Sequence, residues 1–475
     1  MENIKKLLGL FVLLSYLIIN FSSCEKDDPI EEKSANATVN NWILKNMEAY
    51  YFWNEHIPSK NDKSRNPANY FSSLLYTSED RFSWIQENFT DLLDYLSGIQ
   101  MEAGYDYRLV WPDTTQQNVV GIINYIKPNS PASKTDLKRG DIFSTINGIR
   151  ITRSNYGNLL DALSEPHTLG IVESINELDP VRDITLSVTK YEENPVFLDT
   201  IYYIAGKKIG YLVYNFFAED KGDNTFTYAK ELNNIFGEFK TTGINELILD
   251  LRYNSGGALT TSSELASMIS NRKGTDVFCM MQYNQNVGNA LRKKEGANYN
   301  KSYFADWLGQ NIPVNKLTGL NRVFVITSER TASASEVLIN GLKAYMNVIL
   351  IGDVTYGKNV GSITIYEEDK EKQKTNKWGM QPIIVKIANK EEFSDFGNGF
   401  TPDVEISEYS HLPLIPLGDV DEVMLHAALV EMGVMPVSAS LRADKRDTFV
   451  PICSSIDKTP VRRNVYIEPG KLRLK

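Results

Sequence analysis

Short apolar segments alternate with helical patterns in the middle of the chain, and this alternation constrains the fold most. Three strand-like runs are residues 246–250, 323–327 and 348–352. Apolar spacings of three and four residues predict helices over 226–239 and 333–345. Because such alternation is typical of crossover units, we predict that residues 194–410 form an α/β core with a mainly parallel sheet.

Three loops should meet at one edge of this sheet. In a right-handed crossover unit the helix begins where the first strand ends, and the second strand returns the chain to the same edge. Ser333, at the helix start, and Lys358, just beyond the second strand, can therefore lie side by side. Gly256-Gly257 follows the strand 246–250 and reaches that edge, where ligand crevices form in open α/β sheets.

The residues at this edge suit nucleophilic catalysis. A serine hydroxyl needs a base, and Lys358 is the nearest plausible one because no histidine lies near either segment. A solvated lysine titrates at about 10.4, so burial must bring its pKa towards roughly 7–8. The backbone N–H groups of Gly257 and Ala334 are suited to hold a developing oxyanion.

Four blocks of sequence resemble the signatures of the C-terminal processing (tail-specific) serine peptidases. They are residues 250–258 (DLRYNSGGA), 331–336 (TASASE), 355–358 (TYGK) and 398–403 (NGFTPD). The resemblance implies a crotonase-like α/β core that needs no metal or cofactor. It also implies Ser333 as nucleophile, Lys358 as general base, and Gly257 and Ala334 as oxyanion donors.

Two features depart from the pattern of that family. A glutamine usually follows the lysine by four residues and orients its amine, whereas this chain has Ser362 there. A serine could accept a hydrogen bond from the amine over a shorter reach. Residues 258–322 form an unusually long insert between the first two blocks.

Residues 99–193 change to short alternating strands with turns, predicted at 119–126, 141–146 and 183–188, and a short helix predicted at 130–137. Ser130-Pro131-Ala132, Gly140-Asp141 and Asn147-Gly148 resemble a PDZ domain, and Asn-Gly favours a tight hairpin. The resemblance implies that peptide C-termini bind by strand addition, with a backbone loop receiving the carboxylate. The candidate residues for that loop are Gly98, Ile99 and Gln100.

The N-terminal residues indicate a targeting signal. Residues 1–23 join Lys5 and Lys6 to an apolar run of ~20 Å, too short for a ~30 Å hydrocarbon core. Small residues precede Cys24, as in a bacterial lipobox, which implies cleavage there and acylation of Cys24. We therefore expect an extracytoplasmic protein that is lipid-anchored to a bacterial membrane, with the outer membrane and its surface favoured, and a tether over 24–40.

Two further regions complete the predicted organisation. Residues 41–98 space aromatic and aliphatic side chains by three and four, which predicts a helical N-terminal domain. Residues 411–475 hold one predicted helix, 421–432, and a polar tail whose placement the sequence does not determine.

Composition narrows the partners. The 475 residues include 50 basic and 60 acidic side chains, and the net charge of −10 argues against a nucleic-acid binder. Three cysteines and four scattered histidines give neither a disulfide scaffold nor a metal motif, and whether Cys279 pairs with Cys453 is open. The expected partners are protein or peptide substrates and, through the lipid, a membrane.

Other interpretations compete with this one. Ser333 could merely cap a helix, Lys358 could be a solvated loop residue, and Ser335 is an alternative nucleophile. Residues 352–359 nearly match a phosphate-binding loop, but Asn359 replaces the hydroxyl residue and a strand follows where a helix is needed. The main alternative function is a catalytically weak or inactive peptide-binding surface lipoprotein.

Overall fold

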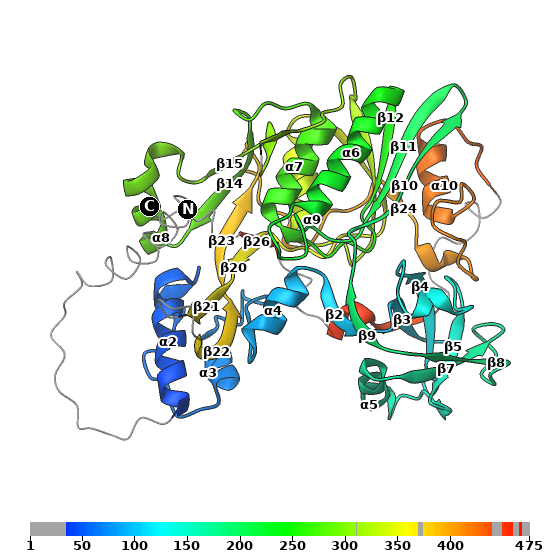
Figure 1. Ribbon diagram of the computed structural model, residues 1–475, viewed down its shortest axis with the longest axis horizontal. Coiled ribbons are helices and arrows are strands. Elements are labelled where there is room, and N and C mark those ends of the chain that lie inside the picture. Colours follow the sequence, from blue (N-terminus) through cyan, green and yellow to red (C-terminus); the bar gives the residue numbers. More distant parts are fainter. Residues whose placement is uncertain (1–34, 310, 369–373, 439–448, 459–464, 468–475) are drawn as a thin grey trace.

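The computed structural model describes residues 35–309, 311–368, 374–438, 449–458 and 465–467. The signal peptide predicted over 1–23 and the acylation site at Cys24 lie outside these residues. An N-terminal unit and a β-rich unit lie side by side beneath a larger α/β core (Figure 1). The chain is thus a mixed α/β protein of several domains.

The core is built on a six-stranded sheet in the order β10-β11-β12-β18-β19-β24. Neighbouring strands are parallel except β10 and β11, so the mainly parallel sheet predicted here is confirmed for this sheet. The strands are β10 Val196–Ile204, β11 Lys207–Tyr214, β12 Glu246–Asp250, β18 Arg322–Thr327, β19 Asn347–Gly352 and β24 Val404–Glu405.

Helices cover both faces of this sheet. Helices α6 (Thr227–Thr242), α7 (Leu259–Ser270) and α9 (Ala334–Lys343) lie on one face, and α10 (Val423–Glu431) lies on the other (Figure 1). Leu247 and Leu249 of β12 pack in the apolar cluster that includes α6, α7 and α9, whereas Ile248 packs in the apolar cluster that includes α10. Burial on both faces explains why the strand runs are continuously apolar. The helices predicted at 226–239, 333–345 and 421–432 correspond to α6, α9 and α10.

A second sheet, in the order β13-β26-β20-β23-β14-β15, packs beside the core. Its strands are β13 Gly257–Ala258, β26 Val465–Ile467, β20 Val360–Ile363, β23 Ile383–Ala388, β14 Val277–Tyr283 and β15 Lys301–Tyr303. The long insert 258–322 is therefore part of the fold, because it supplies α7, β14, α8 (Gln285–Glu295) and β15. The C-terminal tail also enters the fold, through β26.

The N-terminal unit corrects two predictions. Helix α2 spans Ala35–Tyr50, so the last six residues of the predicted tether are helical, and Asn40 is fully buried. Residues 84–86, expected in a helix, form strand β1 (Trp84–Gln86), which pairs with β22 (Lys374–Gln381) of a hairpin with β21 (Ile365–Glu368). Cross-strand pairing with a distant hairpin overrides the local helical spacing. The unit's other helices are α3 (Pro67–Leu74) and α4 (Phe89–Leu96).

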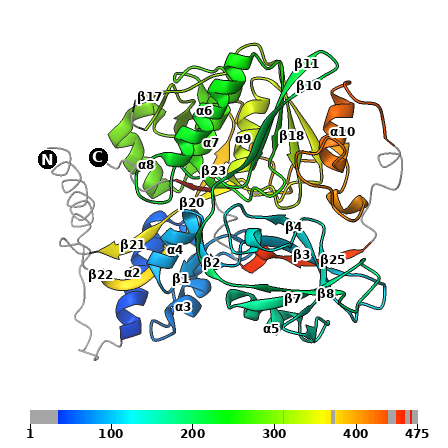
Figure 2. The same ribbon diagram turned by 45° about the vertical axis from the view of Figure 1, so that its right-hand side comes forward.

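Residues 99–193 form a β-rich unit whose sheet runs in the order β25-β3-β4-β5-β7-β8, with β6 paired to β5. The strands are β25 Val450–Ser454, β3 Tyr105–Trp111, β4 Val120–Ile126, β5 Ile142–Ile146, β6 Ile149–Arg150, β7 His167–Val172 and β8 Arg182–Leu186. The three predicted strands match β4, β5 and β8 within two residues. Figure 2 shows β25, from the C-terminal tail, at the edge beside β3.

Two local predictions in this unit are wrong. The helix predicted at 130–137 shrinks to a single 3₁₀ turn, Ala132–Lys134. Ile99 and Gln100 lie in strand β2 (Ile99–Glu102), which pairs antiparallel with β9 (Thr189–Glu192), and not in a loop; Gly98 lies in the turn before β2, and the peptide-binding role of the three residues stays a prediction. Period-two alternation over four residues is too short to distinguish such a strand from a loop. The PDZ assignment of the unit remains a prediction.

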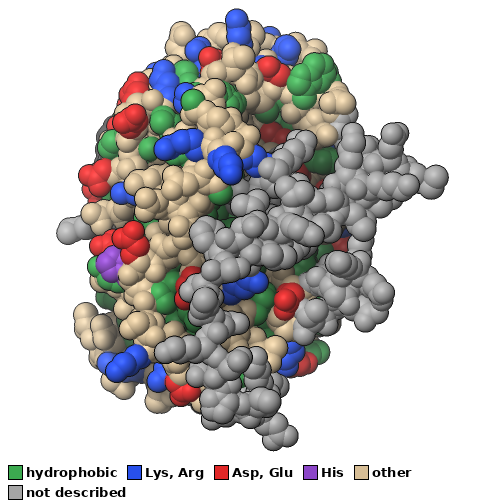
Figure 3. Space-filling view, turned by 90° about the vertical axis from the view of Figure 1, so that its left-hand side faces the viewer, with side chains coloured by type: hydrophobic (Ala, Val, Ile, Leu, Met, Phe, Trp, Pro, Cys, Tyr) green, Lys and Arg blue, Asp and Glu red, His purple; other side chains and the backbone are tan. Residues whose placement is uncertain are grey.

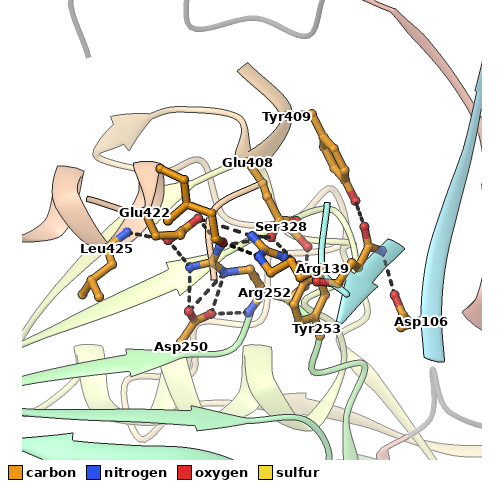
Figure 4. Close-up of polar contacts among 12 residues, drawn as sticks. Asp106, Arg139, Asp250, Arg252, Tyr253, Ser328, Glu408, Tyr409, Glu422 and Leu425 are labelled. Atoms are coloured by element: carbon orange, nitrogen blue, oxygen red, sulfur yellow. Dashed lines mark hydrogen bonds and ion pairs between the residues drawn. The ribbon is translucent and has the colours of Figure 1, made fainter. Parts of the chain in front are cut away.

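A buried ionic network joins the β-rich unit to the core (Figure 4). The guanidinium of Arg252 is fully buried and binds Asp250 at 2.7 Å, Glu422 at 2.7 Å and Glu408 at 3.1 Å. Arg139 of the β-rich unit also binds Glu408, at 2.8 Å. Arg252 follows β12 directly, so the network fixes the loop that leads to Gly256-Gly257.

A second buried ion pair joins Arg330 of the core to Asp106 of β3 in the β-rich unit, and substitutions can measure its contribution to stability. Both bonds of the bidentate pair are 2.7 Å. We expect Arg330→Met to lower the free energy of unfolding by about 3 kcal/mol, because it strands a buried carboxylate. Asp106→Leu combined with Arg330→Met should recover most of that loss in urea denaturation. Equal stability of the single and double variants would contradict the argument.

The described residues include two of the three cysteines. Cys279 and Cys453 form no disulfide with each other. Among the helices that the structure describes, none combines the length and apolarity needed to span a membrane. On the face shown in Figure 3, acidic and basic side chains are interspersed.

Candidate active site

Ser333 occupies a strained position at the start of α9. Its backbone angles are φ 63° and ψ −113°, a region that residues other than glycine rarely adopt and that costs roughly 1–3 kcal/mol. Its side chain is fully buried, and within the described residues its Oγ has no hydrogen-bond partner. Ser335, the alternative nucleophile, differs because its Oγ donates to the carbonyl of Asn254 at 3.0 Å.

The Gly256-Gly257 turn lies directly against this serine. Both glycines have positive φ, 113° and 134°. A Cβ on Gly256 would lie 2.8 Å from the Cβ of Ser333 and 3.2 Å from the backbone nitrogen of Ala334. A Cβ on Gly257 would lie 2.1 Å from the carbonyl oxygen of Phe217, so no larger residue fits there. Gly256 therefore contacts Ser333 and Ala334, and Gly257, the other predicted oxyanion donor, follows it in the same turn.

Glu336 connects Ser333 to Lys358. One carboxylate oxygen accepts the backbone N–H groups of Ser333 and Lys358, each at 2.8 Å, so these two nitrogens are separated by no more than twice that distance. The other oxygen accepts the N–H of Gly357 at 2.8 Å and the hydroxyl of Thr355 at 2.6 Å. Glu336 is not among the site residues predicted from the sequence. Its position three residues after Ser333, where a capping carboxylate is expected, was the available signal.

Lys358 is buried in apolar surroundings. Its side chain has no solvent-exposed surface, and its Nζ lies 4.7 Å from the centre of the Phe82 ring. Burial lowers the pKa of Lys358 from its ordinary 10.5 to about 7, while the charges of Asp80 and Glu336 oppose part of that shift. A neutral amine is therefore present at neutral pH, which excludes the interpretation of Lys358 as a solvated loop residue.

The cover over Lys358 comes from the N-terminal unit. The carboxylate of Asp80 accepts the backbone N–H groups of Phe82 and Ser83, both at 2.9 Å, and so shapes the turn that carries Phe82. Arg81 donates to the carbonyl of Gly357 at 3.3 Å, and Ser83 Oγ accepts the N–H of Ile383 at 2.8 Å. Sequence reasoning missed this cover because 276 residues separate Phe82 from Lys358.

The Phe82 ring offers a direct test through pH dependence. In Phe82→Ala, water should reach the amine and raise the pKa of Lys358 from about 7 towards 10.5. If Lys358 is the predicted base, its neutral amine is the active form, and the acid limb of kcat/KM should move at least about one pH unit to the alkaline side. Phe393→Ala, at a ring that is 46% exposed, is the control and should keep the limb near pH 7. An unmoved limb in Phe82→Ala would count against the ring's role.

The remaining predicted site residue, Ser362, lies on β20. Its Oγ donates to the carbonyl of Val465 in the C-terminal tail at 3.3 Å. Its suggested role in orienting the amine of Lys358 stays a prediction. In the described part of the chain, no group of three or more His, Cys, Asp or Glu side chains could hold a metal ion.

These residues form a chemically coherent arrangement. Within the described residues the buried hydroxyl of Ser333 makes no hydrogen bond, and Lys358, whose backbone N–H shares an oxygen of Glu336 with that of Ser333, has an amine that can be neutral at pH 7. Backbone N–H groups at the start of a helix have no partner within that helix and can stabilise negative charge beside the hydroxyl. These residue types are the ones that nucleophilic catalysis by a serine requires: a hydroxyl, a base that can be neutral, and donors for an oxyanion.

Comparisons with known proteins agree with this arrangement. A model of peptidase family S41 matches residues 208–406, and a model of the peptidase S41 N-terminal domain matches residues 38–84. The first match contains Ser333 and Lys358, and the second contains Phe82. A solved structure of an S41-family protein from Bacteroides fragilis NCTC 9343 is 27% identical, with a TM-score of 0.68, over 87% of this chain and 100% of that one.

Curated relatives are more distant. The carboxy-terminal processing protease CtpB of Bacillus subtilis (strain 168) is 23% identical over 66% of this chain and 58% of its own length. The carboxy-terminal-processing protease of Bartonella bacilliformis is 22% identical over 62% and 60%. The chain spans only about half to three fifths of the curated relatives it matches. Two family models that match separate parts of the sequence, together with the solved relative, lead to one conclusion: over residues 208–406 and 38–84 the chain is similar to peptidase family S41 and its N-terminal domain.

Proposed function

We propose that this protein is a serine endopeptidase of the C-terminal processing type, with Ser333 as nucleophile and Lys358 as general base. The observation that carries the proposal is the carboxylate of Glu336, which binds the backbones of both residues through one oxygen. The low pKa of Lys358, about 7, supports the role of base because a base should titrate near the working pH.

The proposed reaction proceeds through an acyl-enzyme. The amine of Lys358 takes the proton of Ser333 as Oγ attacks the carbonyl carbon of the substrate peptide bond. The N–H groups of Gly257 and Ala334 stabilise the oxyanion of the tetrahedral intermediate. Lys358 then gives its proton to the departing amine, which leaves an ester on Ser333. A water molecule, activated by the same amine, attacks this ester and releases the carboxylate product.

The test is a digest of a denatured protein mixture, with the new termini identified by mass spectrometry. We expect new termini with the wild type and none with Ser333→Ala. Ser335→Ala is the matched control, since it removes a neighbouring buried hydroxyl at a cost of only about 1 kcal/mol of stability and should stay active. Termini that persist in Ser333→Ala would refute the nucleophile assignment.

Residues 99–193 are proposed to recruit substrate. Their resemblance to a PDZ domain favours recognition of unfolded or C-terminal peptide segments by strand addition. The ionic network through Arg139 and Arg252 supports coupling of that recognition to the Gly256-Gly257 turn. If peptides bind but no Ser333-dependent cleavage is found, the protein is a peptide-binding lipoprotein without turnover.

We further propose that Cys24 carries lipid and anchors the protein to a bacterial membrane. The proposal rests on the small residues before Cys24 and the apolar run that precedes them. Labelling of cells with a fatty-acid analogue should mark the wild type and not Cys24→Ser. Unchanged labelling of Cys24→Ser would contradict acylation at this residue.

A further inference from the structure

The C-terminal tail is inserted into the sheet beside the candidate active site. Strand β26 (Val465–Ile467) lies between β13 and β20 and pairs with both in parallel. Val465 is in register with Gly257 on one side and with Gly361 on the other. The tail therefore runs between the loop with the predicted oxyanion donor and the strand that follows Lys358.

The slot between β13 and β20 has features of a site for an extended polypeptide. Its two walls are glycines at the level of Val465, and a Cβ on Gly361 would lie 3.4 Å from the Cγ1 of Val465. The hydroxyl of Ser362 binds the carbonyl of Val465 at 3.3 Å. Val465 is fully buried and Ile467 is 7% exposed, so alternate side chains point into the protein. Backbone pairing with pockets for alternate side chains is the pattern of strand addition.

The direction of β26 relates this slot to the reaction. Because the pairing is parallel, β26 points from its N-terminal end towards higher residue numbers of β20. The N-terminal end of β26 therefore lies at the same end of the sheet as Lys358, which precedes β20, and Gly256, which precedes β13. A Cβ on Gly256 would lie 2.8 Å from the Cβ of Ser333. A polypeptide in this slot would present to Ser333 the peptide bond just before the position of Val465.

We propose that the slot between β13 and β20 binds the substrate segment that follows the cleaved bond, and that the tail occupies it as an intramolecular competitor. The proposal rests on the proposed peptidase function. It assigns the substrate class as extended segments with an apolar, preferably β-branched, residue at the position of Val465 and another at the position of Ile467. A substrate must displace the tail before it can be cleaved.

The kinetic test uses the full chain with Val465→Asp, which places a carboxylate in the buried slot and should expel the tail. KM for an unstructured peptide should fall about tenfold, with kcat unchanged. The factor is the effective concentration of the tail, on the order of 1 mM, divided by the Kd of such a peptide for the slot, on the order of 0.1 mM. Val437→Asp adds the same charge at a residue that is 47% exposed and should leave KM unchanged. An unchanged or higher KM in folded Val465→Asp would overturn the proposal.

A binding test separates this inference from the proposed reaction. A labelled peptide of residues 459–475 should bind a chain that ends at Lys458 and carries Ser333→Ala at least tenfold more tightly than it binds full-length Ser333→Ala. If that preference is found without cleavage by any variant, the slot stands and the peptidase function fails. If cleavage is found but the peptide shows no preference, the slot assignment fails. Should the shortened chain not fold, Val465→Asp with Ser333→Ala replaces it.

The intact mass of the wild type gives a third measurement. A standing competitor is not consumed, so the mass should still include the tail after prolonged incubation. Shortening that depends on Ser333 would make the tail a substrate and would overturn its role as a competitor.

Discussion

Replacing Lys358 with methionine should abolish peptide hydrolysis and raise the stability of the same variant. The loss of the base should lower kcat by about 10³-fold or more. The gain in stability arises because burial disfavours the charged amine of the wild type. A pKa of about 7 in the folded chain against 10.5 in the unfolded chain corresponds to a loss of roughly 4–5 kcal/mol of wild-type stability at and below pH 7. Methionine fills a similar volume without that penalty.

The difference in stability between Lys358→Met and the wild type should depend on pH. Because the folded pKa of Lys358 is depressed, the unfolded chain binds more protons between about pH 7 and 10.5, so the stability of the wild type rises with pH across that window. Lys358→Met should lack this contribution, and its advantage should shrink towards pH 10.5. Urea denaturation at several pH values measures both. A methionine variant that is less stable than the wild type at pH 7 would argue that the lysine is not held neutral by burial.

Replacing Ser333 with glycine should also separate activity from stability. Hydrolysis should fall by on the order of 10⁴–10⁶-fold, as expected when a nucleophile is removed. Glycine reaches φ 63° without the clash of a Cβ, so about 1–3 kcal/mol of backbone strain is released, less roughly 0.5–1 kcal/mol for the greater freedom of the unfolded chain. We expect a net gain in stability of about 1 kcal/mol.

Ser333→Ala is the matched control for this prediction. It removes the same hydroxyl but keeps a Cβ in the strained conformation, so it should be equally inactive and less stable than Ser333→Gly. Thermal unfolding of the two variants side by side measures the difference. If alanine proves as stable as glycine, the backbone at this position holds no strain.

Much of the core could be predicted from the sequence. Runs such as 246–250 and 348–352 are buried on both faces and therefore apolar throughout, which leaves little doubt about strands. The crossover rule then brought Ser333, Lys358 and Gly257 to one edge, and the structure has them there. These features depend on local pattern and on the handedness of the chain, both of which a single sequence contains.

The missed features depend on contacts between remote residues. Phe82 lies in an aromatic-rich segment, but nothing local shows that its ring reaches Lys358. Strand β26 is three residues long, too short for period-two alternation, and its pairing partners lie about a hundred residues or more away. The strand at Ile99 was mistaken for a loop for the same reason. Pairing between distant short segments leaves no periodic trace in sequence.

The cover of Lys358 by residues 80–83 has a consequence for biosynthesis. The ribosome makes this segment early and the lysine late, and the amine is desolvated only when the two have come together. A nascent or otherwise unfolded polypeptide keeps a hydrated, protonated lysine, which cannot take a proton from a hydroxyl. Under the proposed mechanism, the chain therefore stays inert until residues 80–83 have folded over Lys358.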